Sequence, residues 1–176
     1  LQINEPCLPF ISSLQENTVR GNLYVPVIGA GTANTEFEFL TGHSMAFLPS
    51  GSSAYMLYVK DKQPSLAWLL AAQGYTVRAQ HPYYARGWNR PAVYPLLGLS
   101  PFKTLETLFD MTPFTAYQQS GDLATLAATM EELYPGENVL IRQYVSDAYN
   151  YKLLIEDYEQ RDTGKPYFMF NVTMQN

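Results

Sequence analysis

The sequence predicts an α/β protein, a three-layer sandwich in which a mostly parallel central sheet is covered by helices on both faces. Apolar runs with β-branched and aromatic residues, such as 75–81 and 167–173, alternate along the chain with helical segments, such as 65–74 and 147–161. Of the 176 residues, 47% are hydrophobic, which is enough to bury a substantial core. No repeat or low-complexity segment interrupts this alternation. We therefore expect residues 1–176 to form a single partial domain.

The first elements are a helix, a strand and a second helix. The segment "LPFISSLQENTV", residues 8–19, places apolar residues in helical spacing, and "GNLYVPVI", residues 21–28, has the composition of a strand. A short helix is expected over 34–40, because Gly42 stands where a helix C-terminus commonly has its glycine.

The middle of the chain continues the alternation. The Gly and Ser content of residues 47–59 predicts a loop, 65–74 an apolar helix, and 75–81 an alternating strand. Residues 90–99 predict a short helix with proline breaks. Residues 100–117 carry mixed signals, and we expect a strand and a long loop there.

The last part of the chain has four clear segments. Residues 121–136 predict a helix with Asp122 near its start, and "NVLIRQYV", residues 138–145, predicts a strand. A helix over 147–161 and a strand over 167–173 complete the alternation.

Charge and cysteine content exclude several classes of protein. Lys and Arg number 11 against 16 Asp and Glu, so the net charge of -5 argues against a broad nucleic-acid surface. The single cysteine, Cys7, excludes an internal disulfide framework and a multi-cysteine zinc site. No run approaches the roughly 18 apolar residues of a membrane span.

Thr32 is the first candidate for chemistry, because it follows Gly-Ala-Gly at the start of the expected helix. Free backbone N–H groups and the helix dipole favour an anion at such a position. A threonine hydroxyl is a poor nucleophile at neutral pH, however, unless a metal ion or a base takes its proton. The alternative is a helix cap, formed by Thr32 or by Thr35, which has capping-box spacing to Glu38.

The segment "AQHPYYARGWNRPAVY", residues 79–94, follows a predicted strand and lies where α/β sheets place ligands. It concentrates side chains that suit a small phosphorylated ligand: His81, Tyr83, Tyr84, Arg86, Trp88 and Arg90. Arginine can hold phosphate, tryptophan can pack on a polyol, and histidine can donate to an oxyanion. The alternative is a surface loop whose aromatic residues pack on the sheet.

Metal ligands are few. The only histidines are His43 and His81, and no HxxxH pattern is present. We assign Glu36 and Glu38 to the first turn of the helix expected over 34–40. We assign Asp147 to the cap of the helix expected over 147–161. The sequence therefore contains an incomplete metal site.

Five segments in order carry a resemblance to a known family: "GTANTEFEFLTG", "SAYMLYVKDKQPSLAWLL", "HPYYARGWNRPAVYPLLG", "SDAYNYKLLIEDYE" and "KPYFMFNVTMQN". With these segments the chain resembles the extracellular catalytic domain of lipoteichoic acid synthase and its relatives. These are sulfatase-like phosphoglycerol transferases of the alkaline phosphatase superfamily. The resemblance covers nearly the whole chain, and it implies the fold of that superfamily.

The resemblance also implies roles for individual residues. Thr32 would be the nucleophile and a ligand of a divalent metal, usually manganese, whose other ligands lie outside these residues. His81, Trp88 and Arg90 would contact the glycerol phosphate group. Tyr83 stands where the lipoteichoic acid synthase pattern has an aspartate, which puts the acceptor or headgroup preference in question.

The implied function is metal-dependent transfer of phosphoglycerol from a phosphatidylglycerol-like lipid to a cell-wall polymer of the lipoteichoic acid type, through a covalent threonine intermediate. We expect the chain to be an internal piece of a membrane-anchored protein, placed at the extracellular face of the cell membrane and inactive without its missing ligands. The expected partners are the lipid headgroup and the polymer acceptor, and not nucleic acid.

Two other readings remain. One is a sulfatase or a phosphodiesterase of the same superfamily. The sequence speaks against a sulfatase, because the C/S-x-P-x-R segment that begins at Cys7 has Ile11 in place of the required arginine. A non-catalytic module that binds headgroup or polymer through the aromatic residues 83–88 is the other.

Overall fold

The computed structural model describes residues 12–19, 21, 24–25, 27 and 31–174. Its helices are α2 (Thr32–Thr41), η1 (Met45–Phe47), α3 (Ala54–Leu57), α4 (Leu66–Ala72), η2 (Gly87–Asn89), α5 (Arg90–Leu96), α6 (Leu105–Leu108), α7 (Thr112–Ser120), α8 (Leu123–Leu133) and α9 (Asp147–Glu159). Its strands are β1 (Thr76–His81), β2 (Phe102–Thr104), β3 (Leu140–Ile141), β4 (Tyr144–Val145) and β5 (Tyr167–Asn171).

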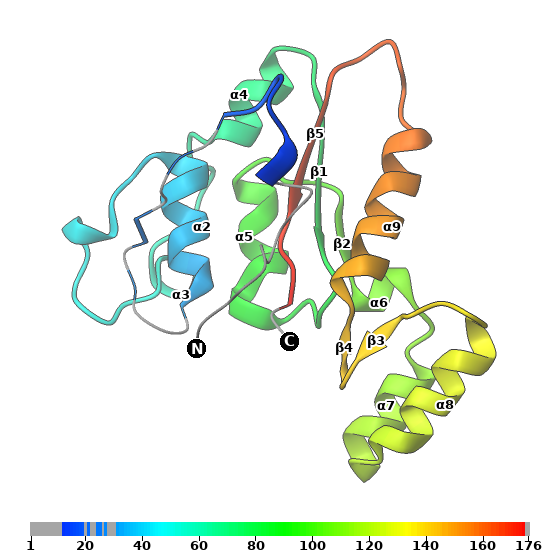
Figure 1. Cartoon of the computed structure of the whole chain (residues 1–176). Coiled ribbons are helices and arrows are strands. Elements are labelled where there is room, and N and C mark those ends of the chain that lie inside the picture. Colours follow the sequence, from blue (N-terminus) through cyan, green and yellow to red (C-terminus); the bar gives the residue numbers. More distant parts are fainter. Residues whose placement is uncertain (1–11, 20, 22–23, 26, 28–30, 175–176) are drawn as a thin grey trace.

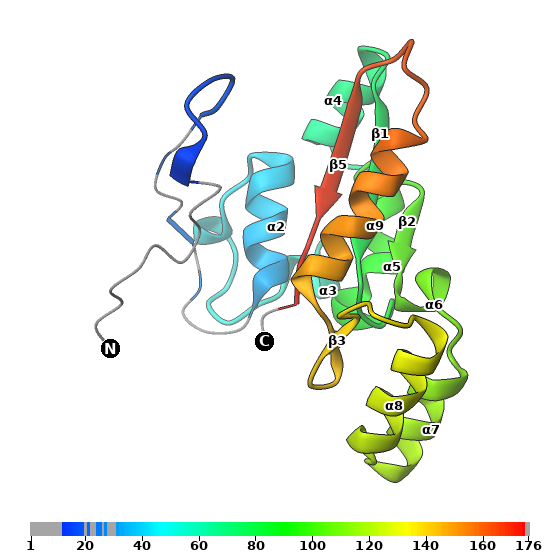
Figure 2. The same ribbon diagram turned by 45° about the vertical axis from the view of Figure 1, so that its right-hand side comes forward.

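The main sheet has three parallel strands in the order β2-β1-β5. The central strand, β1, pairs with β5 over five residues and with β2 over three. Helices α2 and α5 lie on one side of the sheet and α9 on the other (Figures 1 and 2). The predicted α/β class with a parallel sheet between helices is thus confirmed. All three carboxyl ends lie at the same edge, so residues beyond them can meet there.

The main core fills the space between the sheet and helices α2 and α5. Its buried side chains include Phe37 and Leu40 of α2, together with Val93 and Tyr94 of α5. Phe170 of β5 packs against this core, with its ring centroid 6.2 Å from that of Tyr94. This packing holds α2 and α5 against one face of the sheet.

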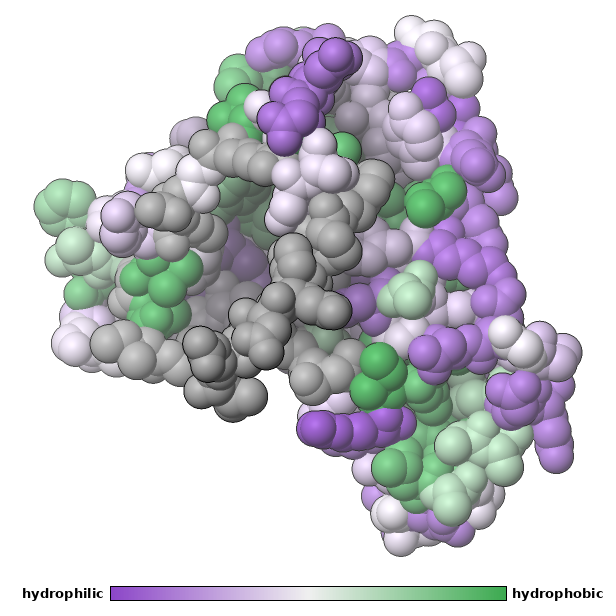
Figure 3. Space-filling model, in the orientation of Figure 1, coloured by the Kyte–Doolittle hydropathy of each residue, from purple (hydrophilic) through white to green (hydrophobic). Residues whose placement is uncertain are grey.

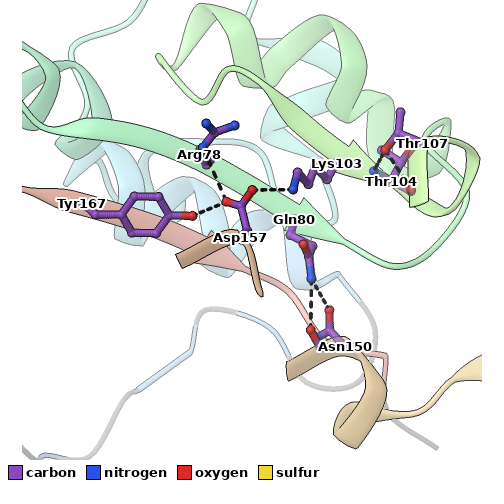
Figure 4. Close-up of polar contacts among 8 residues, drawn as sticks. All are labelled: Arg78, Gln80, Lys103, Thr104, Thr107, Asn150, Asp157 and Tyr167. Atoms are coloured by element: carbon purple, nitrogen blue, oxygen red, sulfur yellow. Dashed lines mark hydrogen bonds and ion pairs between the residues drawn. The ribbon is translucent and has the colours of Figure 1, made fainter. Parts of the chain in front are cut away.

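On the other face, α9 is attached to the sheet by polar contacts (Figure 4). The Asp157 carboxylate accepts a hydrogen bond from the Lys103 ammonium at 2.5 Å and another from the Tyr167 hydroxyl, and it forms an ion pair with Arg78 at 3.4 Å. Burial acts against the charge, but the Lys103 and Tyr167 hydrogen bonds lower the pKa of Asp157 overall. Figure 3 shows mostly hydrophilic residues along the right-hand edge of the molecule, where α9 runs in Figure 1.

A second, smaller core lies between α6, α7, α8 and the start of α9. It buries apolar side chains from these helices and from the segments that connect them: Leu105, Phe109, Phe114, Leu126, Met130, Val139, Val145 and Tyr149. Helices α7 and α8 extend beyond the carboxyl edge of the sheet (Figures 1 and 2). This lobe therefore lies near the edge where a ligand site is expected.

Several predicted elements need correction. Residues 100–117 contain the expected strand, but α6 and the start of α7 replace the long loop. Residues 138–145 form an antiparallel hairpin of β3 and β4 instead of one strand, because Arg142 takes a left-handed φ of 56° between them. The predicted loop 47–59 contains the short helix α3. Of the helix expected over 8–19, residues 8–11 lie outside the described residues, 12 and 13 are helical, and 14–19 are not. Of the strand expected over 21–28, residues 21, 24, 25 and 27 are described and are not in a strand, and the others lie outside the described residues.

Other predictions are confirmed with small shifts of their ends. The helix expected over 34–40 is α2, which ends at Gly42 with a left-handed φ of 71°. The segments 65–74, 90–99, 121–136 and 147–161 contain α4, α5, α8 and α9. Among the described residues, no helix has both the length and the apolar character that a membrane span requires.

Candidate functional site

A cavity of about 530 Å³ lies at the carboxyl edge of the main sheet. Among the described residues, three parts of the chain line it: the start of α2, the segment from the end of β1 to α5, and the segment from the end of β5 onward. The lining residues are Thr32, His81, Tyr83, Gly87, Trp88, Arg90, Asn171, Val172, Thr173 and Met174. The structure therefore brings all five predicted site residues, Thr32, His81, Tyr83, Trp88 and Arg90, to one cavity, while Tyr84 and Arg86 are not part of its lining.

Thr32 is the first residue of α2 and is exposed. The residue at the N-cap is Gly31, whose left-handed φ of 75° suits glycine. The interpretation of Thr32 or Thr35 as the cap is thus wrong. The predicted capping box is also wrong, because Glu38 accepts from the Met45 N–H at 2.6 Å instead of bonding back to the helix start. The Thr32 hydroxyl is left at the positive end of a ten-residue helix.

His81 ends β1 and is only 4% exposed. Its Nδ1 lies 2.8 Å from the Val172 carbonyl oxygen. Because a carbonyl oxygen only accepts, Nδ1 must carry the proton. Burial lowers the pKa of His81, and the nearby Arg90 charge lowers it further, against the opposing effect of the Val172 hydrogen bond. The imidazole is therefore neutral near pH 7, and its Nε2 is an acceptor.

Arg90 begins α5 and is 2% exposed. Its Nη2 lies 2.5 Å from Glu36 Oε1 and its Nε lies 3.2 Å from Glu36 Oε2, so the pair is bidentate. Although burial opposes the charge, the Glu36 carboxylate raises the pKa of Arg90. Nη1 donates to the Gly87 carbonyl oxygen at 3.3 Å. Among the contacts of the described residues, one N–H on each terminal nitrogen of Arg90 is left for a ligand.

Glu36 supports the candidate site through Arg90, and its predicted place in the first turn of its helix is wrong. It is 5% exposed and belongs to the second turn of α2. Its Oε2 also accepts from the Tyr94 hydroxyl at 2.9 Å. Glu36 follows Thr32 by four residues, so the two lie on the same face of α2. Glu36 therefore connects the helix of Thr32 to Arg90. The sequence signal that could have placed Glu36 at the site was the Glu-Phe pair that closes the "GTANTEF" segment.

Trp88 has an unusual backbone for a bulky residue, with φ at 57°. Its side chain is still 38% exposed at the cavity. Such left-handed conformations cost free energy in residues other than glycine and tend to persist at functional positions. Tyr83 packs its ring between those of His81, Tyr84 and Tyr144, at centroid distances of 5.0 to 5.9 Å. A tyrosine thus stands on the wall of the cavity beside His81.

The described residues do not by themselves fit a metal ion. Nowhere in the described ranges do three His, Cys, Asp or Glu side chains come close enough to hold one. Glu36 and Glu38 are already engaged by Arg90 and by the Met45 N–H.

The predicted cap of α9 is wrong by one residue. Asp147 lies in the first turn of α9, and the cap is Ser146, because the Ser146 hydroxyl accepts from the Tyr149 N–H at 3.1 Å.

The fold and the cavity define an α/β protein with its candidate site at the carboxyl edge of a parallel sheet. A family model described as Sulfatase matches residues 3–176. The chain belongs to the sulfatase family. This membership supports a role of the hydrolase or transferase kind.

One curated relative is the "Putative cyclic beta-1,2-glucan modification protein" of Rhizobium meliloti (strain 1021), with 37% identity over 168 residues. That alignment covers 96% of this chain and 21% of the relative, so the chain spans about a fifth of its length.

Two solved structures share the fold. The lipoteichoic acid synthase LtaP from Listeria monocytogenes matches with a TM-score of 0.57 and 17% identity, covering 86% of this chain and 30% of that one. A protein in the alkaline phosphatase superfamily from Vibrio parahaemolyticus matches with a TM-score of 0.51 and 19% identity, covering 82% of this chain and 28% of that one. The predicted resemblance to this group of proteins is confirmed.

Proposed function

We propose that the protein transfers a phosphoglycerol group from a phosphatidylglycerol-like lipid to a hydroxyl group of a carbohydrate polymer. One observation carries the proposal: an exposed threonine at a helix start, a neutral histidine and a charged arginine line one cavity. These groups supply a nucleophile, a proton acceptor and a partner for phosphate. The relative named for cyclic glucan modification supports a glucan as the polymer.

In this proposal the Thr32 hydroxyl oxygen attacks the phosphorus of the lipid. The bond between phosphorus and the diacylglycerol oxygen breaks, and a glycerophospho-threonine forms. His81 Nε2 accepts the hydroxyl proton and returns it to the leaving diacylglycerol oxygen. The free N–H groups of Arg90 and of the first turn of α2 stabilise the charge on the phosphoryl oxygens.

The second half-reaction reverses these roles. A polymer hydroxyl attacks the phosphorus of the intermediate, and its proton passes to His81 Nε2. The bond between phosphorus and the Thr32 oxygen breaks, and that oxygen takes the proton back. If water takes the place of the polymer hydroxyl, the same steps release glycerol phosphate, and the enzyme is a hydrolase.

A divalent metal is part of the proposal, because enzymes of this superfamily generally depend on one. The ligand that this chain would supply is Thr32, and the ion, manganese in our proposal, would make the threonine hydroxyl more acidic. We also propose that residues 1–176 belong to one catalytic domain at the extracellular face of the cell membrane, since the donor is a membrane lipid.

The test replaces Thr32 in the complete protein. With phosphatidylglycerol vesicles as donor, T32A should abolish release of diacylglycerol while lipid binding persists. T32S, which keeps a hydroxyl, should retain part of the turnover and accumulate a serine adduct of the mass of a glycerophospho group. The matched control is T35A on the same helix, which should turn over normally. Normal turnover by T32A would refute the proposal.

A further inference from the structure

The contact that orients His81 is its hydrogen bond to the Val172 carbonyl oxygen, at 2.8 Å. Val172 directly follows β5, which ends at Asn171, and within the described residues β5 pairs with β1 alone. The Val172 N–H donates to the Gln80 carbonyl oxygen at 2.9 Å. The direction of the Val172 carbonyl therefore depends on how firmly the last residue of β5 is held against β1.

Three amide side chains form a network that holds this last residue. Gln80 on β1 is the register partner of Asn171 on β5, and Asn150 on α9 is fully buried between them and its helix. Gln80 Nε2 donates to the Asn150 carbonyl oxygen at 3.2 Å and to Asn150 Oδ1 at 2.8 Å (Figure 4). Asn150 Nδ2 donates to Asn171 Oδ1 at 3.3 Å. Asn150 thus contacts both of the other amides.

One orientation of the three amides satisfies these contacts. The Asn150 backbone carbonyl only accepts, so Gln80 must present its nitrogen to it. The Asn150 side chain must then turn its oxygen to Gln80 and its nitrogen to Asn171. Gln80 Oε1 is buried and has no hydrogen-bond partner in the part of the chain that the structure describes. The Gln80 amide is therefore held through its nitrogen, by Asn150.

The network lies on the opposite face of the sheet from the cavity. Gln80 and His81 are successive residues of β1, so their side chains point to opposite faces. His81 lines the cavity, whereas Gln80 meets α9. Asn150 is 0% exposed and cannot touch a ligand. Any effect of Asn150 on the reaction must therefore pass through Val172 and His81.

We propose that Asn150 is a positioning residue for His81. By holding Asn171 beside β1, Asn150 fixes the Val172 carbonyl, which keeps the proton on His81 Nδ1 and leaves Nε2 as the acceptor. The inference rests on the proposed function, in which His81 Nε2 takes the proton of Thr32. It adds to that function a residue of α9 that sets the tautomer of the proton acceptor from behind the sheet.

The kinetic test places N150L in the complete protein, because leucine is close to asparagine in size and forms no hydrogen bond. With phosphatidylglycerol vesicles as donor, N150L should lower kcat for diacylglycerol release about tenfold and leave KM within about twofold. A positioned proton acceptor contributes roughly 10²–10⁴-fold to a rate, and the groups that bind phosphate are unchanged. In an H81Q background N150L should cause less than about a twofold further loss. An independent tenfold loss in that background would overturn the proposal.

The matched control is D157N, which loosens the same helix at its other end. Asp157 attaches α9 to Lys103 and to Tyr167, the first residue of β5, far from His81 along the strand. D157N should lower stability and keep the wild-type kcat, and equal losses of kcat in N150L and D157N would refute a role through His81. If N150L does not fold, N171A serves in its place, because it removes only the last bond of the network.

A spectroscopic measurement separates this inference from the proposed function. In the complete protein labelled with ¹⁵N-histidine, the ring N–H signal of His81 is the one that H81Q removes. Its exchange with water should be about tenfold faster in N150L and unchanged in D157N. Faster exchange in N150L, without lipid cleavage by the wild type, would support the positioning role and refute the proposed function. Lipid cleavage by the wild type, with exchange and kcat unchanged in N150L, would refute the positioning role alone.

Discussion

Replacing Glu36 with leucine leaves the Arg90 guanidinium buried without its counter-charge. The two side chains are 4% and 3% exposed, so water cannot take over the role of the carboxylate. The variant loses the bidentate contact at 2.5 and 3.2 Å and also the Tyr94 hydroxyl bond at 2.9 Å. Breaking a buried ion pair from one side costs about 3–5 kcal/mol, and we expect E36L to lose a free energy of unfolding in this range.

The double variant E36L/R90M gives the decisive comparison. Because it removes both charges and fills the space with apolar groups of similar size, it should be more stable than E36L by about 2 kcal/mol or more. Urea denaturation gives the free energies of unfolding, and hydrogen exchange of the α2 amides shows whether the loss is local. The control K165A breaks an exposed ion pair with Asp162 and should change stability by less than about 1 kcal/mol.

A loss of stability in E36L/R90M that equals the sum of the losses in E36L and in R90M would contradict this prediction. It would mean that Glu36 and Arg90 stabilise the fold independently, through packing, and not through their ion pair. A small loss in E36L alone would likewise show that the arginine finds water or another partner.

Three further changes have defined outcomes. Burial lowers the pKa of His81, so the unfolded state binds more protons; stability should fall as the pH drops below about 6.5. H81Q should make the urea midpoint depend less on pH between about pH 7.5 and about pH 5. An equal dependence in H81Q and the wild type would contradict the lowered pKa of His81. G98A should cost about 2–3 kcal/mol, because Gly98 has φ at +78° and a Cβ there lies 2.9 Å from the Trp68 ring. Gly74 has φ at +87° with open space around it, so thermal melts of G74A should show the smaller, strain-only loss. S146A removes the side-chain cap of α9 and should lower the free energy of unfolding by about 1–2 kcal/mol in urea titrations; wild-type stability would exclude the cap.

Local patterns were sufficient to predict most of the elements. The strand β1 and the helices α4, α8 and α9 follow from alternation and helical spacing over their own residues. The hairpin of β3 and β4 could not be predicted in this way, because its turn uses Arg142 in a left-handed conformation, without the glycine or asparagine that usually marks such a turn.

The errors at α2 have a different cause. Thr35 and Glu38 have the spacing of a capping box, but Gly31 supplies the cap position and Glu38 bonds to the Met45 N–H. Glu36 was misplaced because its partner, Arg90, is 54 residues away along the chain. Sequence spacing reports on neighbours within one helix, and it carries no information on which distant charge a buried carboxylate meets.

The contact between Glu36 and Arg90 also explains why the predicted site residues meet. Thr32 depends on α2 for its position, and Arg90 depends on α5, so the two could move apart if the helices were joined by apolar packing alone. A bidentate ion pair has one preferred geometry, which fixes the angle between the carboxylate on α2 and the guanidinium on α5. His81 is held from a third direction by the Val172 carbonyl at the end of β5. In the proposed reaction, one directional contact thus holds the helix of the nucleophile against the phosphate partner, and a second holds the proton acceptor. Such fixed geometry is what phosphoryl transfer requires of a protein.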